Sequence, residues 1–282
     1  MREPICITIP FHADLSYLET ALRSLIGQRD LDWTAIVVDD ASPQPGASQV
    51  VAALGDDRID IVRNDTNLGI AANFNRCLEL GANAAAIVTI FHADDVLEPG
   101  YVSSVRAAHS AFPDAACVAP RATVIGGDGH PKRTLADTTK ALLWPRRLPF
   151  VLEGDRGLAR LVHGLFFYCP AVSYRVDLLP ELRFDGRWQQ VMDLDLFGRI
   201  LLDDGCIVVV GDREYRYRRH DASATAAHTR SSLRSTEEAA VSREIVDAAR
   251  RRGWLRAVRA GRLRPIVRAG DWLSRRHRTT VL

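Results

Sequence analysis

Five carboxylates stand where they could bind a metal ion or move a proton: Asp39, Asp40, Asp94, Asp95 and Asp193. The first two end an apolar run at 33–38, and the next two follow another at 85–91. Two neighbouring carboxylates raise each other's pKa unless a cation or hydrogen-bond donors offset their repulsion. Each pair therefore predicts either a divalent cation with a phosphate, or a simpler role in capping the next helix or turn.

Apolar, β-branched runs alternate with helical segments over roughly the first 125 residues. We expect strands at 5–9, 33–40, 59–64 and 85–91, and helices at 15–26, 47–54 and 69–81. Asp14 is the expected N-cap of the first helix and Gly81 the expected stop of the third. Strands that are apolar along their whole length indicate a parallel sheet covered on both faces. Ligands of such sheets lie at the carboxyl ends of the strands, so both acidic pairs should reach one crevice.

The pattern is looser in the second half. A turn is expected at 126–131, and an irregular loop at 130–150. Further helices are expected at 155–163 and 193–203, and further strands at 171–175, 206–210 and 214–218. From 231 to the end the pattern is helical.

Composition is that of an ordinary soluble globule. The 282 residues contain no apolar run long enough to span a bilayer and no secretory signal at the N-terminus, so we expect a cytoplasmic protein. The five cysteines are far apart and form no C-x-x-C pair. This predicts neither a disulfide framework nor a zinc cluster.

Charge is unevenly distributed along the chain. Residues 250–282 hold eleven Arg and one acid, a local charge of +10, so the overall charge of +2 leaves −8 for the remainder. Apolar residues alternate with these Arg on helices interrupted near Gly253, Gly261 and Pro265. Such a segment either lies on an anionic membrane surface or is an ordinary helix packed on the body with a solvated Arg face.

Six segments together resemble family 2 glycosyltransferases with the GT-A fold: ICITIPFHADLSYLETALRSLIGQ, AIVVDDAS, NLGIAANFNRCLE, FHADDVLEPGYV, QQVMDLDLFGRI and YRYRRHDASAT. The resemblance extends to about residue 225. It implies an α/β fold with a Rossmann-like, mostly parallel sheet, a nucleotide-diphosphate sugar as donor, a divalent cation (Mn2+ or Mg2+) and transfer with inversion. The expected organisation is a nucleotide-sugar half at 1–125, an acceptor and catalytic-base half at 126–230, and a basic helical extension at 231–282.

The resemblance also implies individual site residues. The donor site would comprise Pro10, Phe11, His12, Asp40, Asn67, Asn73, Asp94 and Arg218. Asp95 would bind the metal directly, Asp94 would lie near the ribose or metal, and His220 would be a further metal or phosphate ligand. Many relatives have an acid where this chain has His92, so the predicted metal site holds one carboxylate fewer.

Inverting transfer also requires a carboxylate that takes the proton of the acceptor hydroxyl. Asp193 aligns with the family's base, while Met192 replaces the Glu that usually precedes it. The alternative for Asp193 is helix capping. Asp195 is expected to be either a helix N-terminal acid or a structural partner of Arg199 one helical turn later.

Competing functions make different demands on the sequence. A nucleotidyltransferase would need a Gly-rich, basic loop after the first strand, where this chain has PFHADLS, and an NAD-dependent enzyme would need G-x-G-x-x-G there. His92 and Met192 leave a non-catalytic nucleotide- or membrane-binding relative open. For an enzyme we expect a glycan, lipid-linked or small-molecule acceptor, as in cell-envelope polysaccharide or glycolipid synthesis. We also expect peripheral contact with the inner face of the membrane through 250–278, and no nucleic acid partner.

Overall fold

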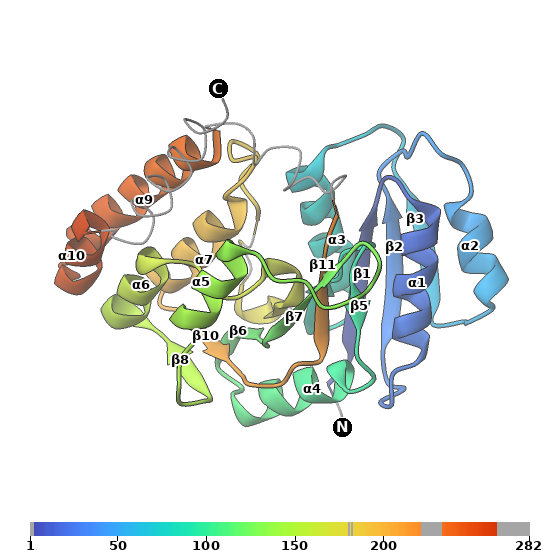
Figure 1. Ribbon diagram of the computed structural model, residues 1–282, viewed down its shortest axis with the longest axis horizontal. Helices are drawn as coiled ribbons and strands as arrows, with labels where there is room; N and C mark the ends of the chain where they lie inside the picture. The colour runs from blue at the N-terminus through green and yellow to red at the C-terminus, as the bar shows by residue number, and fades with distance from the viewer. Residues whose placement is uncertain (1–2, 180, 182, 221–232, 264–282) are drawn as a thin grey trace.

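An eight-stranded sheet runs through the centre of the protein in the order β3-β2-β1-β4-β9-β6-β10-β8 (Figure 1). The computed structural model describes residues 3–179, 181, 183–220 and 233–263. The strands of this sheet are β1 (Ile5–Phe11), β2 (Thr34–Asp39), β3 (Ile59–Arg63), β4 (Ile87–Ile90), β6 (Ala115–Ala119), β8 (Phe150–Leu152), β9 (Ser173–Arg175) and β10 (Cys206–Val209).

Most neighbouring strands of the sheet are parallel. β1 pairs in parallel with β2 and β4, β2 with β3, and β6 with β10. β9 is antiparallel to both of its neighbours and β8 is antiparallel to β10. The expected α/β fold with a mostly parallel sheet is therefore confirmed. Because Phe11 lies opposite Asp39 and Thr8 opposite Ile90, the loops after β1, β2 and β4 leave the same edge of the sheet.

Helices cover both faces of the sheet. One face carries α1 (Leu15–Ile26), α2 (Ala47–Leu54) and α4 (Tyr101–Ala111), and its core contains Ile5, Ile7 and Ile9 of β1. The other face carries α3 (Ile70–Ala84), α6 (Gly154–His163) and α7 (Met192–Leu202), with a core that includes Val88 and Ile90. Short 3-10 helices, η1 (Cys169–Ala171) and η2 (Val176–Leu178), flank β9. Side chains that alternate along each strand thus supply two separate cores.

A second, three-stranded sheet joins distant parts of the chain. β11 (Tyr215–Arg219) is antiparallel to β5 (Val96–Leu97) and parallel to β7 (Ala122–Gly126). β5 directly follows Asp94 and Asp95, so this pairing brings that turn against the YRYRRH segment. The division expected at residue 125 does not separate two sheets, since β6 precedes it and β9 and β10 follow it within one sheet.

Two helices form the described part of the C-terminal extension, at one end of the molecule (Figure 1). α9 (Leu233–Arg251) and α10 (Leu255–Leu263) are separated by Gly253, which has a left-handed φ of 73°. α10 packs against α6 and α9 and buries Ala257, Val258 and Ala260. This is the packed-helix alternative, with Arg256 and Arg259 on the exposed side. The remainder of the predicted membrane segment, 264–278, lies outside the described residues.

Two sequence predictions about elements are wrong. Gly81 lies inside α3 and does not end it: an added Cβ would lie 2.6 Å from Cγ1 of Val88, so the glycine permits close packing of helix and sheet. The expected loop at 130–150 contains α5 (Leu135–Leu143), which begins with a capping box made by Thr134 and Asp137. The predicted cap of α1 is confirmed, because Asp14 accepts hydrogen bonds from the N–H groups of Ser16 and Tyr17.

Candidate active site

The loops after β1 and β2 and the start of α3 meet at one edge of the sheet. Nδ1 of His12 lies 3.1 Å from the carbonyl oxygen of Asp40, and its Nε2 lies 3.2 Å from Nδ2 of Asn67. The Asp40 carboxylate accepts hydrogen bonds from the N–H groups of Leu68, at 2.8 Å, and Gly69, at 3.1 Å. The structure therefore brings together His12, Asp40 and Asn67, three of the residues predicted to bind a donor.

Other predicted donor residues lie behind this edge. Phe11 is only 2% exposed, and its carbonyl oxygen accepts a hydrogen bond from the Asp40 N–H, while Pro10 lies beside it in β1. Asn73 is buried, and its amide contacts Asn64 and the carbonyl oxygen of Val38. Their direct contact with a donor stays a prediction.

The turn after β4 concentrates three possible metal ligands. His92, Asp94 and Asp95 each offer one ligand atom, and these atoms lie within 4.8 Å of one another. Asp95 is only 1% exposed. One of its carboxylate oxygens accepts a hydrogen bond from the Tyr215 hydroxyl at 2.7 Å, and the other from the Arg218 N–H at 2.6 Å. Burial, with the neighbouring charge of Asp94, raises the pKa of Asp95 well above its ordinary value.

Asp94 is more accessible and faces His220. Its Oδ2 lies 2.8 Å from Nε2 of His220, and its side chain is 29% exposed. Burial acts to raise the pKa of Asp94, but the hydrogen bond with His220 and the charges of His92 and His220 lower it overall. Asp94 is therefore an anion that already has a potential co-ligand at its side.

Arg218 links β11 to the turn after β4 that contains Asp94 and Asp95, which we call the acidic turn. Its Nε donates to the Asp94 carbonyl oxygen at 2.6 Å, and one terminal nitrogen donates to the carbonyl oxygens of Gly126 and Gly127. Tyr17 of α1 contacts both Arg218 and His220. Its ring centre lies 4.9 Å from the Arg218 guanidinium carbon and 5.0 Å from the centre of the His220 ring. Sequence reasoning missed Tyr17, because its position on the polar side of α1 gives no motif signal.

Asp193 lies in the first turn of α7, where it accepts a hydrogen bond from the Leu194 N–H at 2.8 Å. Lys140 of α5 interacts with it electrostatically, and Nζ of Lys140 donates to the Phe167 carbonyl oxygen at 2.8 Å. Burial lowers the pKa of Lys140 to about 8, although the charge of Asp193 acts in the opposite direction. Lys140 was missed because its segment was expected to be a loop. The predicted pair of Asp195 and Arg199 is confirmed at 2.8 Å.

The possible ligand atoms around the acidic turn fit a divalent cation. Neighbouring ligand atoms of an octahedral cation with bonds of about 2.1 Å stand about 3 Å apart, close to the 2.8 Å between His220 and Asp94. Asp95 uses two of its roughly four lone-pair positions, so others remain for a cation. Nε2 of His92 is buried and has no hydrogen-bond partner among the described residues. Carboxylate oxygens and imidazole nitrogens together suit Mn2+, and the carboxylates also suit Mg2+.

Sequence comparisons agree with the motifs. The family model described as Glycosyl transferase family 2 matches residues 6–182. An uncharacterized protein of Mycobacterium tuberculosis (strain CDC 1551 / Oshkosh), MT1568, is 26% identical over 269 residues, which cover 89% of this chain and 75% of that protein.

Solved structures share the fold at low sequence identity. TarS 1–349 of S. aureus in complex with UDP-GlcNAc has a TM-score of 0.66 at 16% identity, over 86% of this chain and 66% of that one. GalNAc-T7 with UDP, GalNAc and Mn2+ has a TM-score of 0.55 at 12% identity, over 79% of this chain and 46% of that one. The chain thus spans less than two thirds of either structure.

Proposed function

The chain belongs to glycosyl transferase family 2, and we propose that it transfers a sugar, with inversion, from a nucleotide diphosphate to an acceptor hydroxyl. One observation carries this proposal: two groups of polar side chains lie at the edge of the sheet where β1, β2 and β4 end. The first group is His12, Asp40 and Asn67, and the second is Asp94, which follows β4 and lies 2.8 Å from His220. TarS and GalNAc-T7, which share the fold, were solved with UDP or a UDP-sugar. This supports a uridine diphosphate donor.

In this proposal the base and ribose lie against the His12, Asp40 and Asn67 cluster. Asp40 accepts three hydrogen bonds within the protein, from Asn64, Leu68 and Gly69, which leaves about one lone-pair position for an N–H of the base. The side chains of His12 and Asn67 are exposed and can contact the ribose. Pro10 and Phe11 support the cluster from β1.

The diphosphate would lie at the acidic turn. Asp94 and His220 would hold the cation, with Asp95 contributing a remaining lone pair and His92 its unpartnered nitrogen. A bound Mn2+ or Mg2+ offsets the charge that grows on the departing diphosphate. Hydrogen bonds from Tyr215 and Arg218 fix the orientation of Asp95 before the cation binds, as outer contacts of metal ligands commonly do. One terminal nitrogen of Arg218 has no hydrogen-bond partner among the described residues, and it would donate to the diphosphate.

Asp193 is the proposed base. Its carboxylate would accept the proton of the acceptor hydroxyl while that oxygen attacks the sugar from the side opposite the diphosphate. Lys140 interacts electrostatically with this carboxylate. The position of Asp193 in the first turn of α7 also places it beside the partial positive charge of a helix N-terminus.

Donor hydrolysis tests the proposed chemistry. We expect slow, Mn2+- or Mg2+-dependent release of UDP from a UDP-sugar, reduced at least about 100-fold by Asp193→Asn, because general base catalysis contributes about that much. Asp203→Asn is the matched control, since Asp203 is exposed just beyond the other end of α7. Nucleotide binding without turnover, under every cation and acceptor condition, would identify a non-catalytic relative instead.

The acceptor proposal includes the basic C-terminal extension. We propose that it brings the enzyme to an anionic membrane surface and that the acceptor is lipid-linked. No helix within the described ranges is both long enough and apolar enough to cross a bilayer, and α10 buries its apolar side against the body. Contact would therefore be electrostatic and peripheral. Sedimentation with vesicles containing phosphatidylserine measures it, compared with neutral vesicles.

A further inference from the structure

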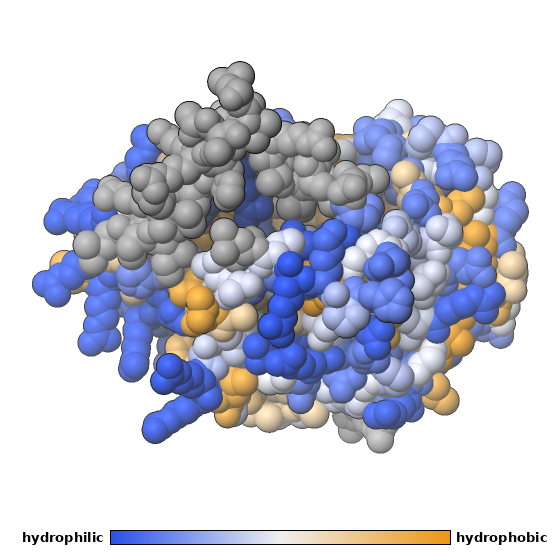
Figure 2. Space-filling model, viewed as in Figure 1, coloured by the Kyte–Doolittle hydropathy of each residue, from blue (hydrophilic) through white to orange (hydrophobic). Residues whose placement is uncertain are grey.

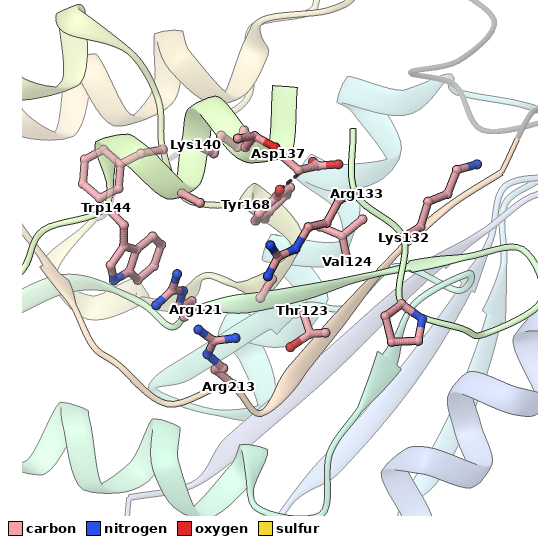
Figure 3. A pocket seen from close by; sticks show the side chains of 15 residues that line it. Arg121, Thr123, Val124, Lys132, Arg133, Asp137, Lys140, Trp144, Tyr168 and Arg213 are labelled. Atoms are coloured by element: carbon pink, nitrogen blue, oxygen red, sulfur yellow. Dashed lines mark hydrogen bonds between the residues drawn. The ribbon is translucent and has the colours of Figure 1, made fainter. Parts of the chain in front are cut away.

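A second concave site lies between β7, α5 and the segment that precedes β11 (Figure 3). We call it the arginine pocket, because Arg121, Arg133 and Arg213, which lie just before β7, α5 and β11, extend into it. Its cavity has a volume of about 210 Å³. That is below the range of about 300 to 1,000 Å³ for sites that enclose a whole ligand, so it fits one group of a larger molecule.

The pocket carries an excess of positive charge. Lys132 and Lys140 also line it, and among the described residues Asp137 is its only acidic lining residue. The Asp137 carboxylate already pairs with Arg219 at 2.7 Å. Hydrophilic residues gather on the same face of the molecule, over the segment between β7 and α5 (Figure 2). Apart from Lys140, which interacts with Asp193, the lining cations have no carboxylate partner among the described residues.

Among the residues that the structure describes, the guanidinium groups of the three arginines have no carboxylate partner, although all three lie in one pocket. Buried arginines elsewhere have hydrogen-bond partners: Arg106 binds Asp30 at 2.8 Å, Arg175 binds Glu3 at 2.6 Å, and Arg218 donates to backbone carbonyl oxygens. Within the ranges that the structure describes, no side-chain hydrogen bond or carboxylate reaches the guanidinium groups of Arg121, Arg133 or Arg213. Burial and the charges of Arg213 and Arg133 lower the pKa of Arg121, so these groups repel one another. An anion between them would remove that repulsion.

An aromatic wall closes the pocket on the α5 side. The Trp144 ring lies 5.4 Å from the Arg121 guanidinium carbon and 5.7 Å from the Phe166 ring. Tyr168 lies beside Lys140, whose Nζ is 4.2 Å from the tyrosine ring centre. Such a wall provides an apolar surface for the carbon skeleton next to a charged group, while the guanidinium forks bind its oxygens.

We propose that the arginine pocket binds a phosphate or carboxylate group of the acceptor. The assignment to the acceptor rests on the proposed function. The pocket is built from segments after residue 120, whereas the proposed donor cluster is built from the ends of β1 and β2 and the start of α3. α5 connects the two regions, because Asp137 pairs with Arg219, next to His220, and Lys140 interacts with the proposed base Asp193. An anionic acceptor anchored here would contact the helix that supports the base.

Binding of inorganic phosphate tests the site without an acceptor. Calorimetry is performed at constant ionic strength, with UDP and Mg2+ present to occupy the proposed donor site. The double variant Arg121→Gln/Arg213→Gln should bind phosphate at least ten-fold more weakly than the unaltered protein. Its melting temperature without phosphate should not fall, because the substitutions remove repulsion. Arg243→Gln removes one charge from the exposed side of α9 and should change nothing. Equal phosphate binding by the double variant would overturn the site, and Arg133→Gln provides a second test if the double variant does not fold.

Transfer assays separate an acceptor group from a free anion. Oligosaccharides with and without a phosphate or carboxylate group are compared as acceptors with one UDP-sugar. Charged acceptors should be preferred, and the double variant should raise their KM at least ten-fold while leaving donor hydrolysis unchanged. Phosphate binding combined with equal use of charged and neutral acceptors would overturn the acceptor assignment. Absence of donor hydrolysis in every protein would instead contradict the proposed function, and leave the phosphate result standing.

Discussion

At the scale of single residues, the two adjacent acids of the turn after β4 have different surroundings. Asp95 is enclosed and accepts hydrogen bonds from Tyr215 and the Arg218 N–H, whereas the Asp94 side chain is 29% exposed and contacts His220. Asp95→Ala should therefore lower the free energy of unfolding by about 2 to 4 kcal/mol, because it leaves two buried donors unpaired. Asp94→Ala should cost less than about 1 kcal/mol but weaken cation-dependent UDP binding at least ten-fold. Urea unfolding and UDP titration with and without Mn2+ measure the two effects.

Equal destabilisation by the two substitutions would contradict this division. Substitution of Asp128, an exposed acid in the nearby turn after β7, provides the control for loss of one charge. If Asp94→Ala bound UDP and Mn2+ normally, the cation would have to be held by Asp95 and the histidines alone.

Sequence motifs predicted which polar residues gather at this edge, but not how each one is used. The structure brings His12 to Asp40 and Asn67, and brings Asp94 to His220, while the roles that the family resemblance implies for them stay predictions. Whether a carboxylate oxygen is free or bonded depends on partners far along the chain: Asp95 bonds to residues about 120 positions away. No local pattern carries that information. For the same reason Tyr17 and Lys140, which contact the site from α1 and α5, gave no signal.

At the scale of elements, a buried histidine fastens α4 to β9. His109 is 0% exposed, and its Nε2 lies 2.9 Å from Oγ of Ser173. Burial, reinforced by the charge of Arg175 and opposed by Glu3, lowers the pKa of His109 to about 4. The unfolded chain, with an ordinary histidine pKa of about 6.5, binds the proton more readily. The contribution of His109 to the free energy of unfolding is therefore fully present above about pH 6.5 and is lost as the pH falls towards 4. The loss between pH 7 and pH 5 is about 2 kcal/mol.

Urea unfolding at pH 7 and pH 5 measures this loss. His109→Gln cannot gain the proton, so its free energy of unfolding should fall by about 2 kcal/mol less over the same interval, although it is less stable at pH 7. His130→Gln, at an exposed turn residue, should follow the unaltered protein. An identical pH dependence of His109→Gln and the unaltered protein would show that other groups govern the acid response.

Element prediction succeeded where periodicity was strong and failed where tertiary contacts decide. The apolar strands β1 to β4 and the amphipathic helix α1 follow from local pattern. Gly81 was expected to end α3, because glycine often follows the last residue of a helix. The helix nevertheless continues to Ala84, and the absence of a side chain at Gly81 lets it pack closely against Val88. α5 was hidden by the Pro- and Arg-rich sequence after it, although T-x-x-D at Thr134 and Asp137 is a recognisable helix start.

At the scale of the whole molecule, local patterns established the α/β class but not how the two halves join. Short β5 and β11 pair across about 120 residues and carry the acidic turn to Arg218 and His220. A strand was predicted at 214–218, where β11 lies, but the two-residue β5 has no detectable period, so the pairing of the two strands could not be predicted from sequence. The basic extension posed the same difficulty, since its pattern fitted both a membrane helix and a packed helix.

Truncation separates those two roles of the extension. α10 buries Ala257, Val258 and Ala260 against α6 and α9, and the Asp155 carboxylate accepts hydrogen bonds from the N–H groups of Arg256 and Ala257, at 3.0 and 2.8 Å. A chain ending at Leu263 keeps these contacts and should melt within about 2 °C of the full chain, as expected when less than about 1 kcal/mol is lost from a domain this large. A chain ending at Gly253 exposes the apolar surfaces of α6 and α9 and should melt at least about 5 °C lower. If the proposed membrane contact is correct, the chain ending at Leu263 should also lose most of its sedimentation with anionic vesicles, because five of the eleven arginines of 250–282 are removed. If the truncated and full chains sediment equally with anionic vesicles, the membrane-binding surface is α10 or the body of the protein and not 264–282. If neither chain sediments, the proposed membrane contact is wrong.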